Sequence, residues 1–169
     1  MKTGFVQRID LWARHLMPAA TMFLLVLLSA VPLGIPGYAQ VTPDFTLMAV
    51  FYWAVYRPDL TPPSVIFLTG LAEDLLHGFP LGLTAIIFLA VYGVTTTQRQ
   101  TFLTKPFFIA WGGFVIISFG AFLLGWSLMS IILLAWIVPD SILARFGLTV
   151  ALFPAMAWLF VRIHRHLVR

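Results

Sequence analysis

The stretch from Phe107 to Val138 contains no charged residue. A helix that crosses the roughly 30 Å hydrocarbon core of a bilayer needs about 20 apolar residues, and shorter apolar runs fill most of the remaining chain. Of the 169 residues, 61% are hydrophobic and only 9% are charged, whereas soluble chains average about 25% charged residues. A soluble fold would therefore lack polar surface. We expect an all-α integral membrane protein that has the lipid bilayer as its solvent and no water-soluble domain.

Prolines, glycines and charged residues divide the chain into six apolar segments. Residues 127–139 are interpreted as an apolar connection or an interfacial helix, and the alternative is that they continue a long fifth helix. Thr42 is the expected N-cap of the second helix, and Pro154 predicts a kink in the last. The predicted helices form one membrane domain over residues 1–169 and cover residues 17–35, 43–56, 62–77, 81–97, 107–126 and 141–163.

The positions of the basic residues predict the orientation of the chain. With six spans and a cytoplasmic N-terminus, nine of the ten lysines and arginines fall on the cytoplasmic side, and only Arg145 lies near the outer face. An odd number of spans would place the basic C-terminus outside. We therefore expect a six-transmembrane-helix bundle with both termini inside. The net charge of +4 comes from the ends of apolar runs, not from a continuous basic surface, so no nucleic-acid partner is expected.

Glu73 and Asp74 are the only acidic residues inside an apolar run. A charge costs about 2.5–3.5 kcal/mol at the bilayer centre, which favours a site for a cation, a partner's arginine or a polar substrate. A position near the headgroups, one turn from the helix end, is the alternative. The two side chains point about 100° apart, so Glu73 is expected to reach toward the headgroups. Asp74 and His77 share a helix face, but two ligands do not make a metal site.

Two further groups of residues allow a structural or a functional interpretation. Tyr52 and Trp53, followed by Arg57, indicate either an aromatic belt at the membrane surface or a docking surface for another subunit. Asp140 and Arg145 indicate a helix start, with Asp140 as N-cap and Arg145 as a surface or bundle-facing charge.

The sequence contains no motif that pairs a nucleophile with a base, no phosphate-binding loop motif and no metalloprotease motif. It also contains no cysteine. We therefore predict no catalytic residue, no metal and no cofactor.

The stretch from 43 to 82 resembles the rod-shape-determining MreD family of bacteria. The resemblance is carried by Tyr52-Trp53, Arg57-Pro58-Asp59 and the spaced motif of Gly70, Asp74, Gly78, Pro80 and Gly82. It implies a fold similar to the six-helix substrate-binding subunits of vitamin transporters. Among the matched positions, Asp74 would be the likeliest functional residue, and Glu73 has no counterpart in the motif.

The resemblance implies a non-enzymatic subunit of the cell-elongation machinery in the bacterial cytoplasmic membrane. Its partners would be an MreC-like bitopic protein, a RodA-like glycosyltransferase, a penicillin-binding transpeptidase and the actin-like MreB. The alternative is a small-solute-binding subunit of a vitamin-type transporter, and an intramembrane enzyme would need a reactive group that the sequence does not show. Stabilisation by a saturable small ligand would favour the transporter.

Overall fold

The computed structural model describes residues 3–30, 42–134 and 140–167, with side chains described over 16–30, 42–134 and 140–163. These residues are helical and contain no strand, which confirms the predicted all-α class. The helices are α1 (Thr3–Ser29), α3 (Phe45–Tyr56), α4 (Pro63–His77), α5 (Leu83–Thr104), α6 (Phe107–Leu133) and α7 (Asp140–Leu167), with a 3-10 turn η1 (Pro58–Leu60) after α3.

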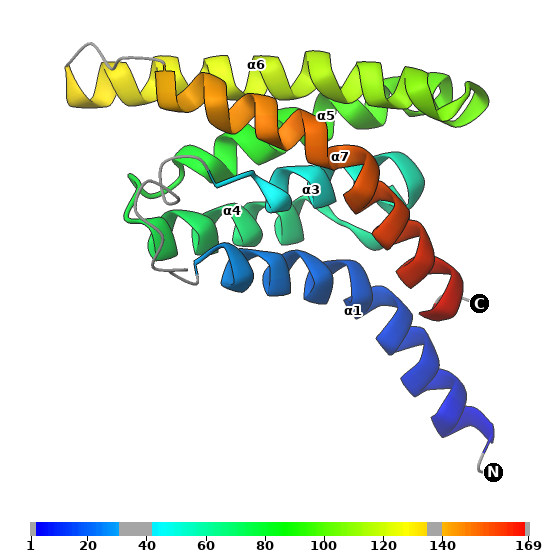
Figure 1. The fold of residues 1–169 in the computed structure, drawn as a ribbon. Helices are drawn as coiled ribbons and strands as arrows, with labels where there is room; N and C mark the ends of the chain where they lie inside the picture. Colours follow the sequence, from blue (N-terminus) through cyan, green and yellow to red (C-terminus); the bar gives the residue numbers. More distant parts are fainter. Residues whose placement is uncertain (1–2, 31–41, 135–139, 168–169) are drawn as a thin grey trace.

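Successive described helices run in opposite directions, so the start of α1 and the end of α7 lie at one end of the bundle (Figure 1). We call this the terminal end, and it also holds the α3–α4 connection at 57–62 and the α5–α6 turn at 105–106. The opposite, distal end holds the α4–α5 turn at 78–82 and the start of α7.

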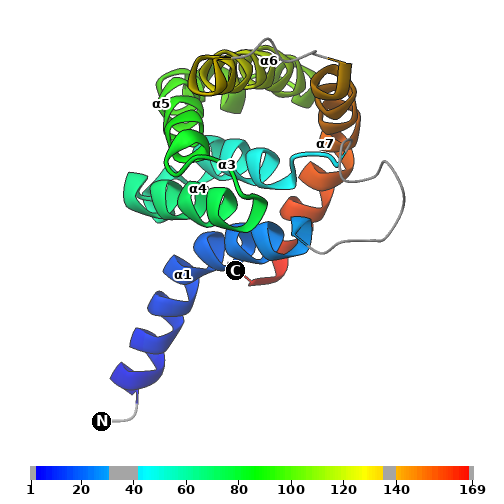
Figure 2. The same cartoon turned by 90° about the vertical axis from the view of Figure 1, so that its left-hand side faces the viewer.

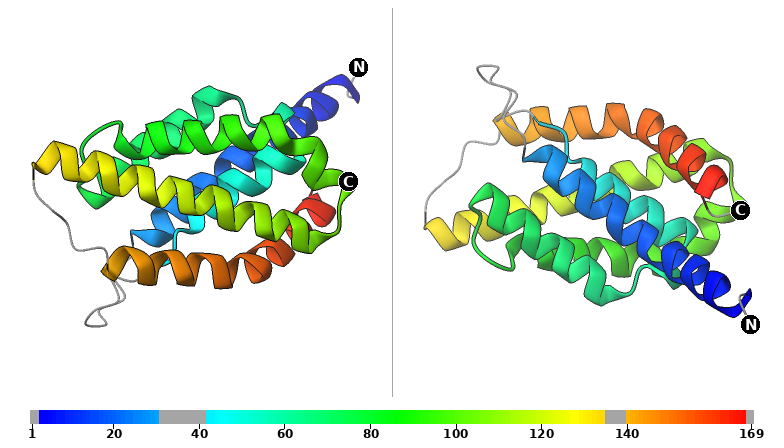
Figure 3. Two further views of the ribbon diagram at one scale, coloured as in Figure 1. Left: turned by 90° about the horizontal axis from the view of Figure 1, so that it is seen from above. Right: turned by 90° about the horizontal axis from the view of Figure 1, so that it is seen from below.

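The short helix α3 lies at the centre of the bundle. It packs against α1, α5 and α7, while α4 packs against α1 and α5, and α6 packs against α5 and α7. Seen from the distal end, α3, α5, α6 and α7 form a ring that leaves α1 outside (Figure 2). The view from below shows α1 crossing the face of the bundle that is opposite α6 (Figure 3).

Helix α3 is apolar all around, and such a helix is stable only inside a protein or a membrane. All residues from Thr46 to Val55 are buried. Its 12 residues cover about 18 Å at the usual helical rise, and the neighbouring helices shield it on every side. Asp44, not the predicted Thr42, is the N-cap, since its carboxylate accepts a hydrogen bond of 2.9 Å from the Leu47 amide.

Besides α6, three helices extend beyond their predicted bounds. Helix α1 begins at Thr3 instead of 17, α5 ends at Thr104 instead of 97, and α7 ends at Leu167 instead of 163. The apolar runs mark where a helix could contact lipid, whereas its backbone hydrogen bonds continue through good helix formers such as glutamine and arginine. Helix α1 also ends at Ser29 instead of 35, and residues 31–41 lie outside the described part.

The interpretation of 127–139 as a connection is wrong over residues 127–133, which belong to α6. No proline or glycine interrupts the chain between Trp126 and Leu133, so nothing ends the helix there. The end comes at Leu134, whose φ of 48° is left-handed. Residues 135–139 lie outside the described part.

Two helices contain an internal proline, and both bend. Helix α7 changes direction in its second half, which holds Pro154, as the sequence predicts, and α1 bends near its middle, where Pro18 lies (Figure 1). Proline removes one backbone hydrogen bond and its ring clashes with the preceding turn. The bends direct the terminal ends of both helices away from α6.

Two described helical segments are long and apolar enough to cross a membrane, judged by length and composition: Phe107–Leu133 and Asp140–Ile163. Large apolar side chains are exposed on both, among them Phe108, Ile116 and Leu143. Exposed apolar side chains in such number would be unfavourable in water.

Candidate functional site

The α4–α5 turn is built around Asp74, which is fully buried. Its carboxylate oxygens accept hydrogen bonds from the backbone amides of Gly82, at 2.9 Å, and Thr84, at 3.0 Å. Gly78 and Gly82 have positive φ values of 69° and 94°, which favour glycine. Asp74 therefore holds the first turn of α5, and it is a structural residue of the hairpin.

Two more residues of the motif act in the same hairpin. A Cβ atom on Gly70 would lie 2.4 Å from the Cα of Ala85, so α4 and α5 approach each other closely at this point. The carbonyl of Pro80 accepts a hydrogen bond of 3.1 Å from the Leu83 amide. All the glycines of the motif, with Asp74 and Pro80, thus shape one turn and the helix pair that it joins.

Glu73 lies next to Asp74 but points into the bundle, where it is only 3% exposed. Its Oε2 accepts a hydrogen bond of 2.9 Å from the Thr46 hydroxyl. Nδ1 of His77 lies 3.7 Å from Oε1 of Glu73 and 3.0 Å from the Glu73 carbonyl oxygen. The expectation that Glu73 reaches out to the headgroups is wrong, because the one-residue offset from Asp74 directs it inward, toward α3.

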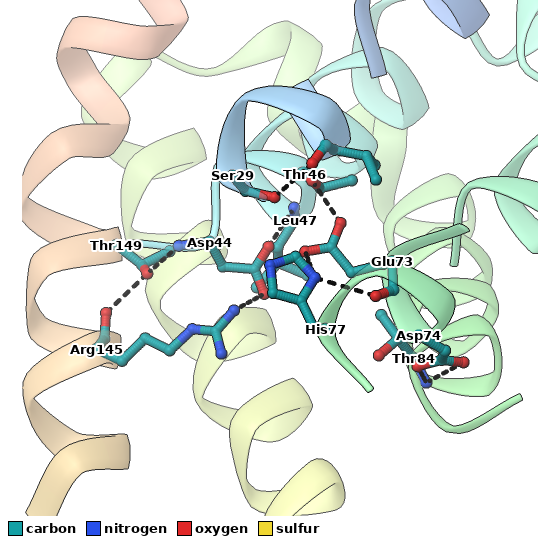
Figure 4. Close-up of polar contacts among 11 residues, drawn as sticks. Ser29, Asp44, Thr46, Leu47, Glu73, Asp74, His77, Thr84, Arg145 and Thr149 are labelled. Atoms are coloured by element: carbon teal, nitrogen blue, oxygen red, sulfur yellow. Dashed lines mark hydrogen bonds and ion pairs between the residues drawn. The ribbon is translucent and has the colours of Figure 1, made fainter. Parts of the chain in front are cut away.

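A third polar group joins the start of α3 to α7. Nη2 of Arg145 lies 3.5 Å from Oδ2 of Asp44, and the Asp44 amide donates to the Thr149 hydroxyl at 3.0 Å. Within the described residues, Nε of Arg145 is buried and has no hydrogen-bond partner. Arg145 is thus a bundle-facing charge. Figure 4 shows Arg145, Asp44, Glu73 and His77 close together at the distal end.

Three of these residues line a cavity of about 270 Å³ at the distal end of the bundle. Asp44, Glu73 and Arg145 form its charged part. Most of the remaining wall is apolar and comes from α5 and α6, with Leu83, Ile87, Phe88, Phe122, Trp126 and Met129 among its residues. A concave, mostly apolar site with a few polar groups is typical of small-molecule pockets.

The aromatic residues of α3 lie outside this cavity and inside the protein core. Tyr52 is 3% exposed and Trp53 is fully buried, with Nε1 of Trp53 donating to the Thr21 hydroxyl at 3.1 Å. The Tyr52 ring centroid lies 5.0 Å from that of Phe160. These rings contact neighbouring helices of their own chain, so they are neither a membrane-surface belt nor a docking surface.

The two motif residues after α3 lie at the terminal end. Nε of Arg57 lies 3.3 Å from Oδ2 of Asp59, and both side chains are partly exposed, as surface ion pairs usually are. The Pro58 carbonyl accepts a long hydrogen bond of 3.5 Å from the Tyr92 hydroxyl. Arg57 and Pro58 thus end α3 and start the turn into α4.

A comparison of the chain with protein-family models, curated proteins and solved structures found no match.

The shape and lining of the distal cavity suit a small molecule, but the described residues around it do not form a metal centre. No group of three or more histidine, cysteine, aspartate or glutamate residues in the described part could hold a metal ion. Asp74 is engaged with backbone amides and His77 contacts Glu73, so these two residues do not converge on one ligand position. Neither Thr46 nor the pairing of Asp44 with Arg145 was predicted from the sequence. The signal available for the pair was two opposite charges at the same predicted end.

Proposed function

We propose that the chain is a non-enzymatic membrane subunit of the bacterial cell-elongation complex, related to the MreD family and resident in the cytoplasmic membrane. The observation that carries the proposal is the α4–α5 hairpin. Gly70, Asp74, Gly78, Pro80 and Gly82 carry the resemblance, and each has a distinct structural task within that hairpin. If the resemblance arose from apolar composition alone, its matched residues would not be expected to shape the same hairpin.

We propose six spans with both termini in the cytoplasm. The antiparallel order of the described helices supports this topology, because the start of α1, the end of α7 and two connections lie at the terminal end. Arg57 and Lys105 lie at this end, whereas Arg145 lies at the distal end. Basic residues are retained on the cytoplasmic side of membranes, so the terminal end would face the cytoplasm.

In this function the subunit would hold partners through its lipid-facing helices. The burial of Tyr52 and Trp53 removes them as contact residues. Exposed apolar side chains remain as surfaces for transmembrane partners on α6 and α7, which include Ile116 and Leu143, and also on α1 and α4, which include Leu24 and Leu68. The expected partners are an MreC-like bitopic protein, a RodA-like glycosyltransferase and a penicillin-binding transpeptidase, with MreB on the cytoplasmic side.

The test is depletion of the protein followed by complementation. Depleted rod-shaped cells should become round, and the wild-type chain should restore rods. Gln98→Ala, which changes an exposed side chain outside the motif, should also restore them, whereas Asp74→Ala should fail because the hairpin loses its central acceptor. Affinity purification in mild detergent should recover the bitopic partner with the wild type.

Unchanged cell shape on depletion would contradict the proposal. If the cells also required a vitamin, the result would favour the small-solute-binding transporter subunit, for which the distal cavity provides a site.

A further inference from the structure

We infer that the distal cavity binds a small amphiphile that carries a primary ammonium group next to an apolar body. The inference goes beyond the proposed function, because an assembly subunit requires no small ligand. It rests on three features of the cavity: a buried carboxylate that no lysine or arginine of the described residues pairs with, an ion pair beside it that neutralises itself, and an extended apolar wall.

The buried carboxylate is that of Glu73. Among the described residues, a side-chain hydrogen bond reaches only its Oε2, from Thr46. Oε1 lies 3.7 Å from His77 Nδ1, which is beyond hydrogen-bond range, and that nitrogen lies closer to the Glu73 carbonyl oxygen. No lysine or arginine of the described residues lies within ion-pair distance of Glu73. Oε1 therefore keeps its capacity to accept a hydrogen bond from a ligand.

The charges around the cavity favour a cationic ligand. Asp44 and Arg145 lie 3.5 Å apart and offset each other, so an ionised Glu73 beside a neutral His77 leaves the site with one net negative charge. An unpaired carboxylate in an apolar site is strongly unfavourable, and a hydrogen-bonded cation offsets part of that cost. A ligand whose only charge is a carboxylate would increase the imbalance. A primary ammonium group provides both the charge and the N–H donors.

The apolar wall and the volume set the size of the ligand. Phe88, Phe122 and Trp126 line the cavity together with aliphatic side chains, and aromatic faces attract an adjacent cation. The volume of about 270 Å³ equals that of about nine water molecules in the liquid. Such a volume suits a compact amine or the ethanolamine headgroup of a lipid, both of which present the same ammonium chemistry.

The first experiment measures the thermal unfolding midpoint of the purified full chain in detergent with increasing phenethylamine. We expect a saturable increase in the midpoint, and little or none with phenethyl alcohol, which has the same apolar body but no charge. Glu73→Gln should weaken phenethylamine binding by about tenfold or more, as expected for the loss of a charged hydrogen bond.

A pair of glycine variants on α6 tests the position of the site without altering Glu73. Gly125 lines the cavity, so Gly125→Leu should fill it and abolish the amine-dependent stabilisation. A Cβ atom added at Gly120 would meet no other atom within 4 Å, so Gly120→Leu should retain the stabilisation. This pair of variants shows whether the amine binds in the distal cavity even if Glu73→Gln does not fold.

A second arm distinguishes a soluble amine from a lipid. The wild type and Glu73→Gln are compared in nanodiscs of phosphatidylethanolamine and of phosphatidylglycerol. Stabilisation by phosphatidylethanolamine that needs Glu73 identifies the headgroup as the source of the ammonium group, and stabilisation by phenethylamine alone identifies a soluble amine.

Equal shifts with the amine and the alcohol, an amine effect that survives Gly125→Leu, or no effect of either ammonium source would overturn the inference. The assembly proposal would be unaffected by any of these results, because it depends on the α4–α5 hairpin and is tested by cell shape.

Discussion

Helices α4 and α5 are in tight backbone contact at Gly70, and replacing this glycine by alanine should separate them. The added Cβ atom would lie 2.4 Å from the Cα and 2.6 Å from the backbone nitrogen of Ala85. Ordinary contacts of this kind are 3.4–4 Å. Because both obstructing atoms belong to the backbone, no side-chain rotation relieves the clash, and the helices must move apart by about 1 Å to restore ordinary packing.

The expected loss of stability follows from two opposing effects. Overpacking a tight interface costs about 1–3 kcal/mol, and a backbone clash belongs at the upper end of that range. The higher helix propensity of alanine compared with glycine stabilises the folded state by about 1 kcal/mol. The net loss is about 2 kcal/mol, which for a chain of this size lowers the unfolding midpoint by about 4–8 °C.

The matched control is Gly93→Ala in α5, where an added Cβ meets no atom within 4 Å. The same substitution should there be neutral or stabilise the protein by up to about 1 kcal/mol. Thermal unfolding of both purified variants, followed by circular dichroism in one detergent, gives the comparison. Equal midpoints for the two variants would refute the close packing of α4 on α5.

Three further predictions concern the hairpin, the core and the orientation. Asp74→Ala should lower the free energy of unfolding by about 2–3 kcal/mol, since buried amides lose their acceptor, whereas Asp59→Ala should change it by less than about 0.5 kcal/mol; thermal unfolding of both variants measures the difference. Trp53→Ala should lower the free energy of unfolding by about 3–5 kcal/mol, as for other large core residues. If thermal unfolding showed unchanged stability and the variant failed only to bind partner proteins, the interpretation of Trp53 as a docking residue would be restored. Since the chain has no cysteine, single variants Lys105→Cys and Asp140→Cys can be labelled in intact cells, and we expect an impermeant maleimide to reach only position 140; labelling of position 105 would contradict the proposed orientation.

The all-helical class and most of the helix order follow from the sequence, because long apolar runs separated by proline and glycine leave few alternatives. The helix ends were less predictable. Hydropathy marks where a helix could contact lipid, and it gives no sign of where backbone hydrogen bonding stops. The extension of α6 to Leu133 and the early start of α1 at Thr3 are examples.

The roles within the site were harder to predict because they depend on tertiary geometry. The sequence singled out Glu73 and Asp74 as a pair in an apolar run, and it correctly placed them on different sides of α4. It could not show which side faces a helix start and which faces a cavity. The amides that donate to Asp74 lie 8 and 10 residues further along the chain, and Thr46 reaches Glu73 from 27 residues away.

For the aromatic residues, the sequence predicted a surface position and the structure shows burial. Tyr52 and Trp53 precede an arginine and a proline, a pattern that is typical of a membrane surface. Their burial results from the position of α3 between α1, α5 and α7, which no local pattern encodes.

The enclosure of α3 has a consequence for how the protein is made. Helix α3 is shorter than a bilayer-spanning helix, and one of the helices that surround it, α7, is synthesised only after α4, α5 and α6. Its native surroundings are therefore complete only once α7 has been made. Until then, the nascent chain must hold α3 with the helices made earlier, which makes the closing of the core around α3 a late step in folding.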